Sequence, residues 1–226
     1  MALSERMNHV RRAQEVFDIE IAALKAVRAH LDGAFERAVE TMVKALRNRG
    51  KVVVVGVGKS GNIGRKIAAT LTSTGTTSVV LNSVDALHGD LGVVSDGDVA
   101  LALSYSGETE ELFNLLPALK RFSVEVIAMT GAPRSTLAKH ADVVLNVRVP
   151  KEACPFNLAP TSSTTAMLAL GDALAMSILD ARGFSKEKFA KHHPAGSIGR
   201  AVVPANQAPS SSRTKAGRSV IRSPRG

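Results

Sequence analysis

A cluster of hydroxyl side chains in the middle of the sequence has the composition of a phosphate-binding loop. Ser104, Ser106 and Thr109 lie between an apolar stretch and a segment with helical periodicity. Each hydroxyl can donate a hydrogen bond to a phosphate oxygen, and the start of the helix adds free backbone N–H groups. Gly107 lets the backbone approach such a ligand. A helix N-cap needs only one hydroxyl, so the three together predict a phosphate site.

A glycine-rich turn earlier in the chain is a second candidate for anion binding. Residues 52–55 are four consecutive valines, which is typical of a strand buried on both faces. The stretch Gly56-Val-Gly-Lys-Ser-Gly61 follows, and residues 63–72 have helical periodicity. A strand that turns through glycines into a helix directs free N–H groups and the positive end of the helix dipole at one point. We therefore expect Lys59 and Ser60 to bind a phosphate, or Lys59 to polarise a substrate hydroxyl group.

The same turn permits other interpretations. Gly56, Gly58 and Gly61 satisfy the dinucleotide fingerprint. That site also requires an acid at the end of the next strand, where this chain has Asn82. A P-loop would need its first glycine at Val53, inside the strand, and is therefore rejected. A tight strand–helix turn without any ligand stays open from these residues alone.

Two glutamates and two histidines fall in the expected loops or helix starts and could move protons. Glu152 lies in an irregular segment between prolines, where an acid has no helix to stabilise, so we favour a functional role for it. Glu111 could instead interact with the dipole at the start of its helix. His88 could be a surface residue, and His193 could cap a helix-like stretch as a cation. The single cysteine, Cys154, excludes an internal disulfide framework and is typical of a reducing cytoplasm.

The apolar pattern predicts alternating helices and strands that would bring these loops together. The expected helices cover residues 5–31, 33–48, 63–72, 110–122, 135–140 and 164–182. The expected strands cover residues 52–55, 77–81, 98–103, 125–129 and 143–147. Strands separated by helices imply parallel βαβ units with helices on both faces. We predict an α/β fold, a three-layer doubly wound sandwich with a mainly parallel five-stranded sheet, whose ligand lies at the carboxyl ends of the strands.

Composition and charge limit the partners. We predict that residues 1–50 are helices of the same domain, that 51–200 are its core and that 201–226 are a disordered basic tail. The tail carries five of the nine net positive charges, and only 4% of residues are aromatic. Both facts argue against a nucleic-acid partner. No apolar run approaches the roughly 18–20 residues of a membrane span and no signal core begins the chain, so we expect a cytoplasmic protein without a membrane partner.

Several motifs together resemble the SIS (sugar isomerase) domain family. The glycine turn at residues 56–61 and the stretch Ser104-x-Ser-Gly-Glu-Thr109 carry the resemblance to the family as a whole. Further stretches are similar to its arabinose-5-phosphate isomerase branch: His88-Gly-Asp-Leu-Gly92, Val149-Pro-Lys-Glu-Ala-Cys-Pro155, Leu158-Ala-Pro-Thr-Ser-Ser-Thr-Thr165 and His193-Pro-Ala-Gly-Ser-Ile-Gly-Arg200. The likeness covers the chain from the region of Val16 to Arg200.

The resemblance implies interconversion of D-ribulose 5-phosphate and D-arabinose 5-phosphate through an enediol, the entry step towards Kdo and lipopolysaccharide. This reaction needs a base near C1 and C2, an acid/base for the oxygens and a phosphate anchor, but no cofactor and no metal. The resemblance implies His193 and Glu152 as an acid–base pair, with Glu111, His88 and Lys59 also catalytic. It also implies a small-molecule sugar phosphate as partner and a homotetramer, in which His193 could come from a neighbouring subunit.

Two other functions stay open. The substrate could be another phosphosugar, because sequence spacing does not measure the pocket. The chain could also be a non-catalytic sugar-phosphate-binding regulator, since SIS domains occur in such proteins, although the first two expected helices show no clear helix-turn-helix. Members of the branch continue past the counterpart of Arg200 into a pair of CBS modules, whereas this sequence continues as the short basic tail. We therefore expect no regulation through such modules.

Overall fold

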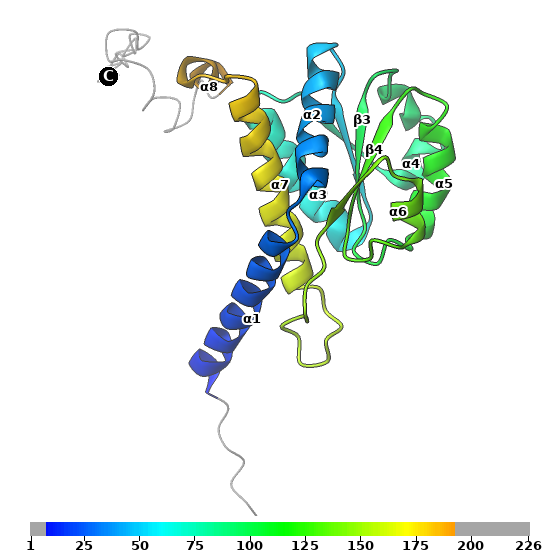
Figure 1. Ribbon diagram of the computed structural model, residues 1–226. Helices are drawn as coiled ribbons and strands as arrows, with labels where there is room; N and C mark the ends of the chain where they lie inside the picture. The colour runs from blue at the N-terminus through cyan, green and yellow to red at the C-terminus, as the bar shows by residue number, and fades with distance from the viewer. Residues whose placement is uncertain (1–7, 193–226) are drawn as a thin grey trace, which may run out of the picture. The chain divides into compact units, whose positions relative to one another are not determined.

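The computed structural model describes residues 8–192, in which strands and helices alternate (Figure 1). The strands are β1 (Val52–Gly56), β2 (Ser78–Leu81), β3 (Val99–Leu103), β4 (Glu125–Thr130) and β5 (Val143–Asn146). They form one sheet in the order β2-β1-β3-β4-β5, and every neighbouring pair is parallel. The predicted α/β fold with a doubly wound parallel sheet is confirmed.

Helices cover both faces of this sheet (Figure 1). One face carries α2 (Gly33–Arg47), α3 (Gly58–Ser73) and α7 (Ser162–Ala181). The opposite face carries α4 (Ser83–Ala86), α5 (Glu110–Leu119) and α6 (Thr136–His140), with the short 3₁₀ turn η1 (Asp90–Val93) following α4. Helix α1 (His9–Ala29) packs against α7. The sequence did not predict α4 or η1, because four residues are too few to establish a helical period.

The valines of β1 show why a continuous apolar run forms a central strand. Val52 and Val54 belong to the core under α2, α3 and α7, whereas Val53 and Val55 belong to the core under α4, α5 and α6. All four are fully buried, since successive side chains of a strand point to opposite faces. Burying each one contributes roughly 1.5–3 kcal/mol relative to exposure.

Helix α3 begins at Gly58, earlier than the predicted start at residue 63. Gly61 lies in its first turn and packs directly on the backbone of β1, where an added Cβ would come within 2.6 Å of the Gly56 carbonyl oxygen. Because glycine has a low helix propensity, these residues do not look helical in the sequence. The close contact between Gly56 and Gly61 is thus a packing reason for these two glycines, and it requires no nucleotide.

Helix α7 is the one helix within residues 8–192 that is long and apolar enough to cross a membrane by length and composition. Half of that apolar window is buried inside the protein, against α1, α2 and α3. Asp172 interrupts it and pairs with Lys66 of α3 at 2.6 Å. Such burial is typical of a core helix.

The described residues up to Ser185 belong to one compact unit. Helix α8 (Lys186–His192) belongs to a second unit and is described by itself; Glu187 lies in its first turn. The predicted tail 201–226, and the end of the predicted core, lie outside the described residues.

Candidate active site

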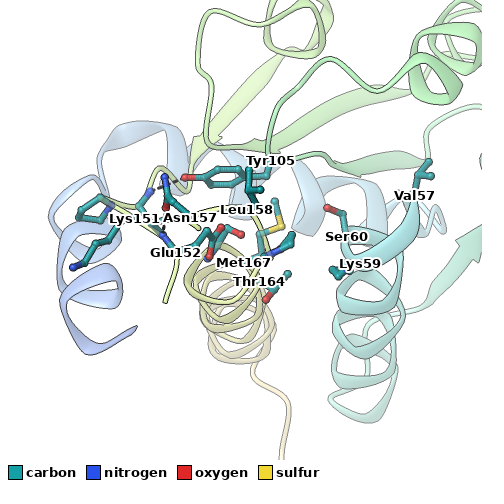
Figure 2. A pocket seen from close by; sticks show the side chains of 14 residues that line it. Val57, Lys59, Ser60, Tyr105, Lys151, Glu152, Asn157, Leu158, Thr164 and Met167 are labelled. Carbon is teal, nitrogen blue, oxygen red and sulfur yellow. Dashed lines mark hydrogen bonds between the residues drawn. The ribbon is translucent and has the colours of Figure 1, made fainter. Parts of the chain in front are cut away.

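A pocket of about 410 Å³ opens beside the carboxyl ends of the strands (Figure 2). Lys59 and Ser60 at the start of α3 form one wall, and residues 149–160, which follow β5, form the opposite wall. Tyr105 and the first turns of α7 lie between them. The strand order reverses at β1, which has β2 on one side and β3 on the other. Ligands of doubly wound sheets bind at such a reversal.

Glu152 lines this pocket. It belongs to the segment between β5 and α7, residues 147–161, called here the β5–α7 loop, and it is hydrogen-bonded to Thr161 at the end of that loop. Its Oε2 accepts hydrogen bonds from the Thr161 N–H at 2.8 Å, the Thr161 hydroxyl at 3.0 Å and the Ser163 N–H at 3.2 Å. The donors stand at the start of α7, where backbone N–H groups lack partners within the helix. None of these three hydrogen bonds involves the other oxygen, Oε1. One oxygen is thus anchored, and the other is available to a ligand.

The protonation state of Glu152 follows from these contacts. Partial burial acts to raise its pKa, but hydrogen bonds from Ser163 and Thr161 to the charged form outweigh that effect. The net result is a pKa below the usual glutamate value. At neutral pH Glu152 is therefore a carboxylate, which can accept a proton.

Further hydrogen bonds hold the loop in one conformation. Asn157 Oδ1 accepts from the Glu152 N–H at 2.7 Å, and the Thr161 hydroxyl accepts from the Ala153 N–H at 2.8 Å. Tyr105 fixes the start of the loop, because its phenol oxygen accepts from the Val149 N–H at 3.1 Å (Figure 2). The pocket wall is therefore tied both to the end of β3 and to the start of α7.

Among the described residues, Cys154 and Glu108 also have shifted pKa values. The Cys154 pKa is below its ordinary value, because backbone N–H groups of the β5–α7 loop point at its sulfur: those of Ala159, Leu158, Phe156 and Asn157. The Glu108 pKa is lowered by hydrogen bonds from Thr136, whose N–H lies 2.9 Å from Glu108 Oε1. Glu108 is exposed and does not line the pocket.

Lys59 faces the loop from the opposite wall. It belongs to the first turn of α3 and is exposed, and no acidic side chain within residues 8–192 forms an ion pair with it. Ser60 lies beside it and is half-buried. A free ammonium next to the N-terminus of a 16-residue helix gives this wall a positive potential. The structure therefore places Lys59, Ser60 and Glu152, three of the residues named from the sequence, in the lining of one pocket.

The hydroxyl-rich loop after β3 has a different arrangement. Ser104 is only 3% exposed, and its Oγ lies 2.7 Å from Thr109 Oγ1 and accepts from the Gly107 N–H at 3.0 Å. Gly107 has φ +64°, and an added Cβ would overlap the Ser135 hydroxyl. Ser106 is exposed, and its Oγ accepts from the Glu108 N–H at 3.2 Å. These groups shape the loop beside the pocket, and within residues 104–109 only Tyr105 lines it.

The remaining predicted residues lie elsewhere or outside the described part of the chain. Glu111 is half-buried in the first turn of α5, and His88 is exposed between α4 and η1. Neither lines the pocket of this chain. His193 falls outside the described residues. Within residues 8–192 no group of three or more His, Cys, Asp or Glu side chains is arranged to hold a metal ion.

Two residues that line the pocket, Tyr105 and Asn157, and one behind its wall, Thr161, were not predicted as site residues from the sequence. Tyr105, Asn157 and Thr161 all contribute hydrogen bonds that hold the pocket wall. Thr161 is the N-cap residue of α7, but its hydroxyl makes no capping hydrogen bond and instead joins Ala153 to Glu152, which no local pattern marks. Tyr105 and Asn157 act on residues whose proximity depends on the folded loop, so no local pattern marks them.

The matched family agrees with this geometry. Residues 45–177 match the model of the SIS domain. The chain belongs to the SIS domain family. The matched range contains the sheet, α3, α5 and most of α7, and so contains every described residue that lines the pocket.

This SIS chain is similar to several characterised isomerases. It is 49% identical over 203 residues to arabinose 5-phosphate isomerase KdsD of Pseudomonas aeruginosa, covering 90% of this chain and 61% of the relative. It is 51% identical over 190 residues to the protein of the same name from Escherichia coli K12, covering 84% and 57%. The chain thus spans about three fifths of the length of these curated relatives.

A solved structure matches this chain over the whole of its own length. It is c3406 of E. coli CFT073 in complex with arabinose 5-phosphate, with 35% sequence identity and a TM-score of 0.79. The match covers 84% of this chain and 100% of that one. The match therefore leaves no part of the solved chain of c3406 unaligned.

Proposed function

We propose that this SIS protein is an aldose–ketose isomerase that interconverts D-ribulose 5-phosphate and D-arabinose 5-phosphate. The observation that carries the proposal is that a free ammonium, that of Lys59, and an ionised carboxylate with one free oxygen, that of Glu152, line the same pocket. Support comes from the names of the KdsD relatives and from the arabinose 5-phosphate complex of c3406.

The reaction requires a base beside C1 and C2 and a cation beside O2. In the forward direction Glu152 Oε1 takes a proton from C1 of the ketose. The electron pair of that C–H bond forms the C1–C2 double bond of a cis-enediol, and the charge on O2 faces Lys59. Return of a proton to C2, with transfer of a proton from O1 to O2, gives the aldose. No electron leaves the substrate, so the proposed chemistry needs no redox cofactor and no metal.

A phosphate anchor would hold the reacting carbons at the right distance from Glu152. We assign it to the N-terminus of α3 with Ser60, and to the exposed face of the loop that holds Ser106, Gly107 and Thr109. Ser104 would not contact the phosphate itself. Its buried hydroxyl instead holds Thr109 and the Gly107 N–H in place by hydrogen bonds. Binding energy from the phosphate would then serve to orient the sugar.

We also propose that copies of the chain associate, as a homotetramer. Helix α1 exposes Val10, Phe17 and Ile21, and the β5–α7 loop exposes Phe156 and Leu158. Large apolar side chains exposed in this number favour contact with a partner. A neighbouring copy could then supply the acid/base groups that the pocket of one chain lacks, for which we retain the three candidates named from the sequence: His193, His88 and Glu111.

The proposal extends to the location of the protein and its pathway, and two alternative functions remain beside it. We propose a cytoplasmic location, which is typical of a protein with one unpaired cysteine, and a place at the entry to Kdo and lipopolysaccharide synthesis. The first alternative is isomerisation of another phosphosugar. The second is a regulator that binds a sugar phosphate without turnover, although the presence of both Lys59 and Glu152 in one pocket favours catalysis over binding alone.

A substrate panel tests this proposal. The purified protein is incubated with D-ribulose 5-phosphate and with six- and seven-carbon ketose phosphates, and kcat/KM is measured for each. We expect turnover of ribulose 5-phosphate to exceed that of the longer sugars by at least about tenfold, the discrimination typical of one or two misfitting carbons. Preference for a longer sugar would support the first alternative, and binding without turnover of any sugar would support the second.

A further inference from the structure

The N-terminal helix α1 reaches the loop that holds Glu152, although the two are far apart in sequence. The Arg12 guanidinium donates from Nη2 to the Ala153 carbonyl oxygen at 2.6 Å. Its other terminal nitrogen, Nη1, lies 3.2 Å from Glu15 Oε2, and the side chain is 34% exposed. Glu15 therefore holds the guanidinium in place, and Arg12 is the described α1 residue that contacts the β5–α7 loop by a hydrogen bond.

Ala153, whose carbonyl group Arg12 contacts, also takes part through its N–H in the hydrogen-bond network of the Glu152 carboxylate. The Ala153 N–H donates to the Thr161 hydroxyl, which in turn donates to Glu152 Oε2. Ala153 is 4% exposed, so little water can replace these contacts. Arg12 thus holds the backbone of Ala153 on its carbonyl side, and two further hydrogen bonds lead from the N–H of the same residue to the carboxylate. Charge-assisted hydrogen bonds such as the first are stronger than those between neutral groups.

Helix α1, which carries Arg12, is itself held against α7. Ala23 and Val27 of α1 are buried in the core shared with α7. The Thr165 hydroxyl of α7 donates to Glu20 Oε2 of α1 at 3.0 Å. Helix α1 lies outside residues 45–177, which match the SIS domain. The Arg12–Ala153 hydrogen bond therefore joins a residue outside the matched range to one inside it.

We propose that Arg12 is a positioning residue of the active site, which holds the Ala153 peptide and through it the Thr161 and Glu152 side chains. This inference rests on the proposed function in that Glu152 has to be the reacting carboxylate. Loss of the Arg12 contact would free the loop to move relative to α7. A small displacement of a reacting group is enough to reduce turnover strongly while the phosphate anchor, on the other wall, still binds the sugar.

The chain offers a matched control one residue away. Arg11 also pairs with Glu15, with its Nε 3.5 Å from Oε1, but its side chain is 80% exposed and does not contact the loop. The substitutions Arg12→Ala and Arg11→Ala therefore remove the same charge and an ion pair to the same acid from the same helix. Only the first also removes the bond to Ala153. A third variant, Arg12→Lys, keeps a positive donor on a flexible stem.

The experiment measures two quantities on the full chain. The first is amide hydrogen exchange of Thr161 and Ser163 without ligand, because these N–H groups donate to Glu152 and their protection reports whether the carboxylate is held. We expect exchange about tenfold faster in Arg12→Ala, as for loss of about one charge-assisted hydrogen bond, and wild-type exchange in Arg11→Ala. The second quantity is the pair kcat and KM for ribulose 5-phosphate.

We expect kcat to fall about 10- to 100-fold in Arg12→Ala, with KM within about threefold of wild type, and Arg12→Lys to recover part of kcat. Equal exchange in the two alanine variants, or unchanged kcat despite faster exchange, would overturn the positioning role. If the wild type does not isomerise the sugar, the proposed function fails by itself, and the exchange of Thr161 and Ser163 still decides whether Arg12 holds the carboxylate.

Discussion

Glu152 and Thr161 are joined by two hydrogen bonds, since Glu152 Oε2 accepts from both the N–H and the hydroxyl of Thr161, at 2.8 and 3.0 Å. The two residues stand at opposite ends of an exposed segment that includes Phe156 and Leu158. The pair therefore converts a long irregular loop into a closed ring at the start of α7. Because Oε2 makes these bonds, the orientation of the whole carboxylate is fixed before a ligand arrives.

Replacing Glu152 by glutamine tests its role as the base. We expect Glu152→Gln to lower kcat about 10²- to 10⁴-fold, the usual contribution of general base catalysis, with little change in KM. Steady-state kinetics with ribulose 5-phosphate measure both. The matched control is Glu108→Gln, which alters an exposed carboxylate that accepts from the Thr136 N–H outside the pocket. Comparable activity of the two variants would remove Glu152 from the chemistry.

The pH dependence of stability provides a second test of Glu152. Its pKa is lower in the folded protein than in the unfolded chain, so between these two values the unfolded state binds more protons. The stabilising effect is complete above the unfolded pKa and is lost as the pH falls through the folded pKa. Urea unfolding of wild type and Glu152→Gln should thus differ most near pH 7 and converge in acid. A difference that grows in acid would contradict the lowered pKa.

Lys59 should bind the developing negative charge. We expect Lys59→Ala to reduce kcat/KM about 10²-fold or more, as for loss of one donor to an anionic transition state. The control is Lys66→Ala, about two turns further along α3, which removes only a surface ion pair with Asp172 and should keep kcat/KM within about twofold. Normal activity of Lys59→Ala would place the positive charge on another residue.

The two serines after β3 should behave differently. Ser106 is exposed, so Ser106→Ala should raise KM for the sugar phosphate with little effect on thermal stability. Ser104 is buried and holds Thr109 and the Gly107 N–H, so Ser104→Ala should also lower the free energy of unfolding by about 1–3 kcal/mol. Calorimetric melting and steady-state kinetics separate the two effects. An unchanged KM in both variants would move the phosphate to the N-terminus of α3 alone.

The sheet could be predicted from the sequence because its signals are local. Runs such as residues 52–55 show burial on both faces by composition, and the helices between them dictate parallel pairing. The start of α3 could not be predicted, since Gly61 is helical for a reason that only its packing on β1 reveals.

The site was predicted in part for a related reason. Lys59 and Glu152 were found because the loops after parallel strands meet at one end of the sheet. Two contacts could not be predicted from the sequence: Glu152 accepts from N–H groups at the start of α7, and Arg12 donates to the Ala153 carbonyl oxygen. Both contacts join segments whose approach depends on tertiary packing, and no periodicity in the sequence reports such an approach.

The most direct test of the isomerase account is proton NMR of D-ribulose 5-phosphate in D₂O with the purified protein. The account predicts an anomeric signal of D-arabinose 5-phosphate, with deuterium at C2 of the aldose, because a proton held by the base in an enediol mechanism can exchange with solvent. The contradicting result is no aldose signal, with binding of ribulose 5-phosphate still detected by calorimetry. That result would make the protein a sugar-phosphate-binding regulator or an isomerase of another sugar.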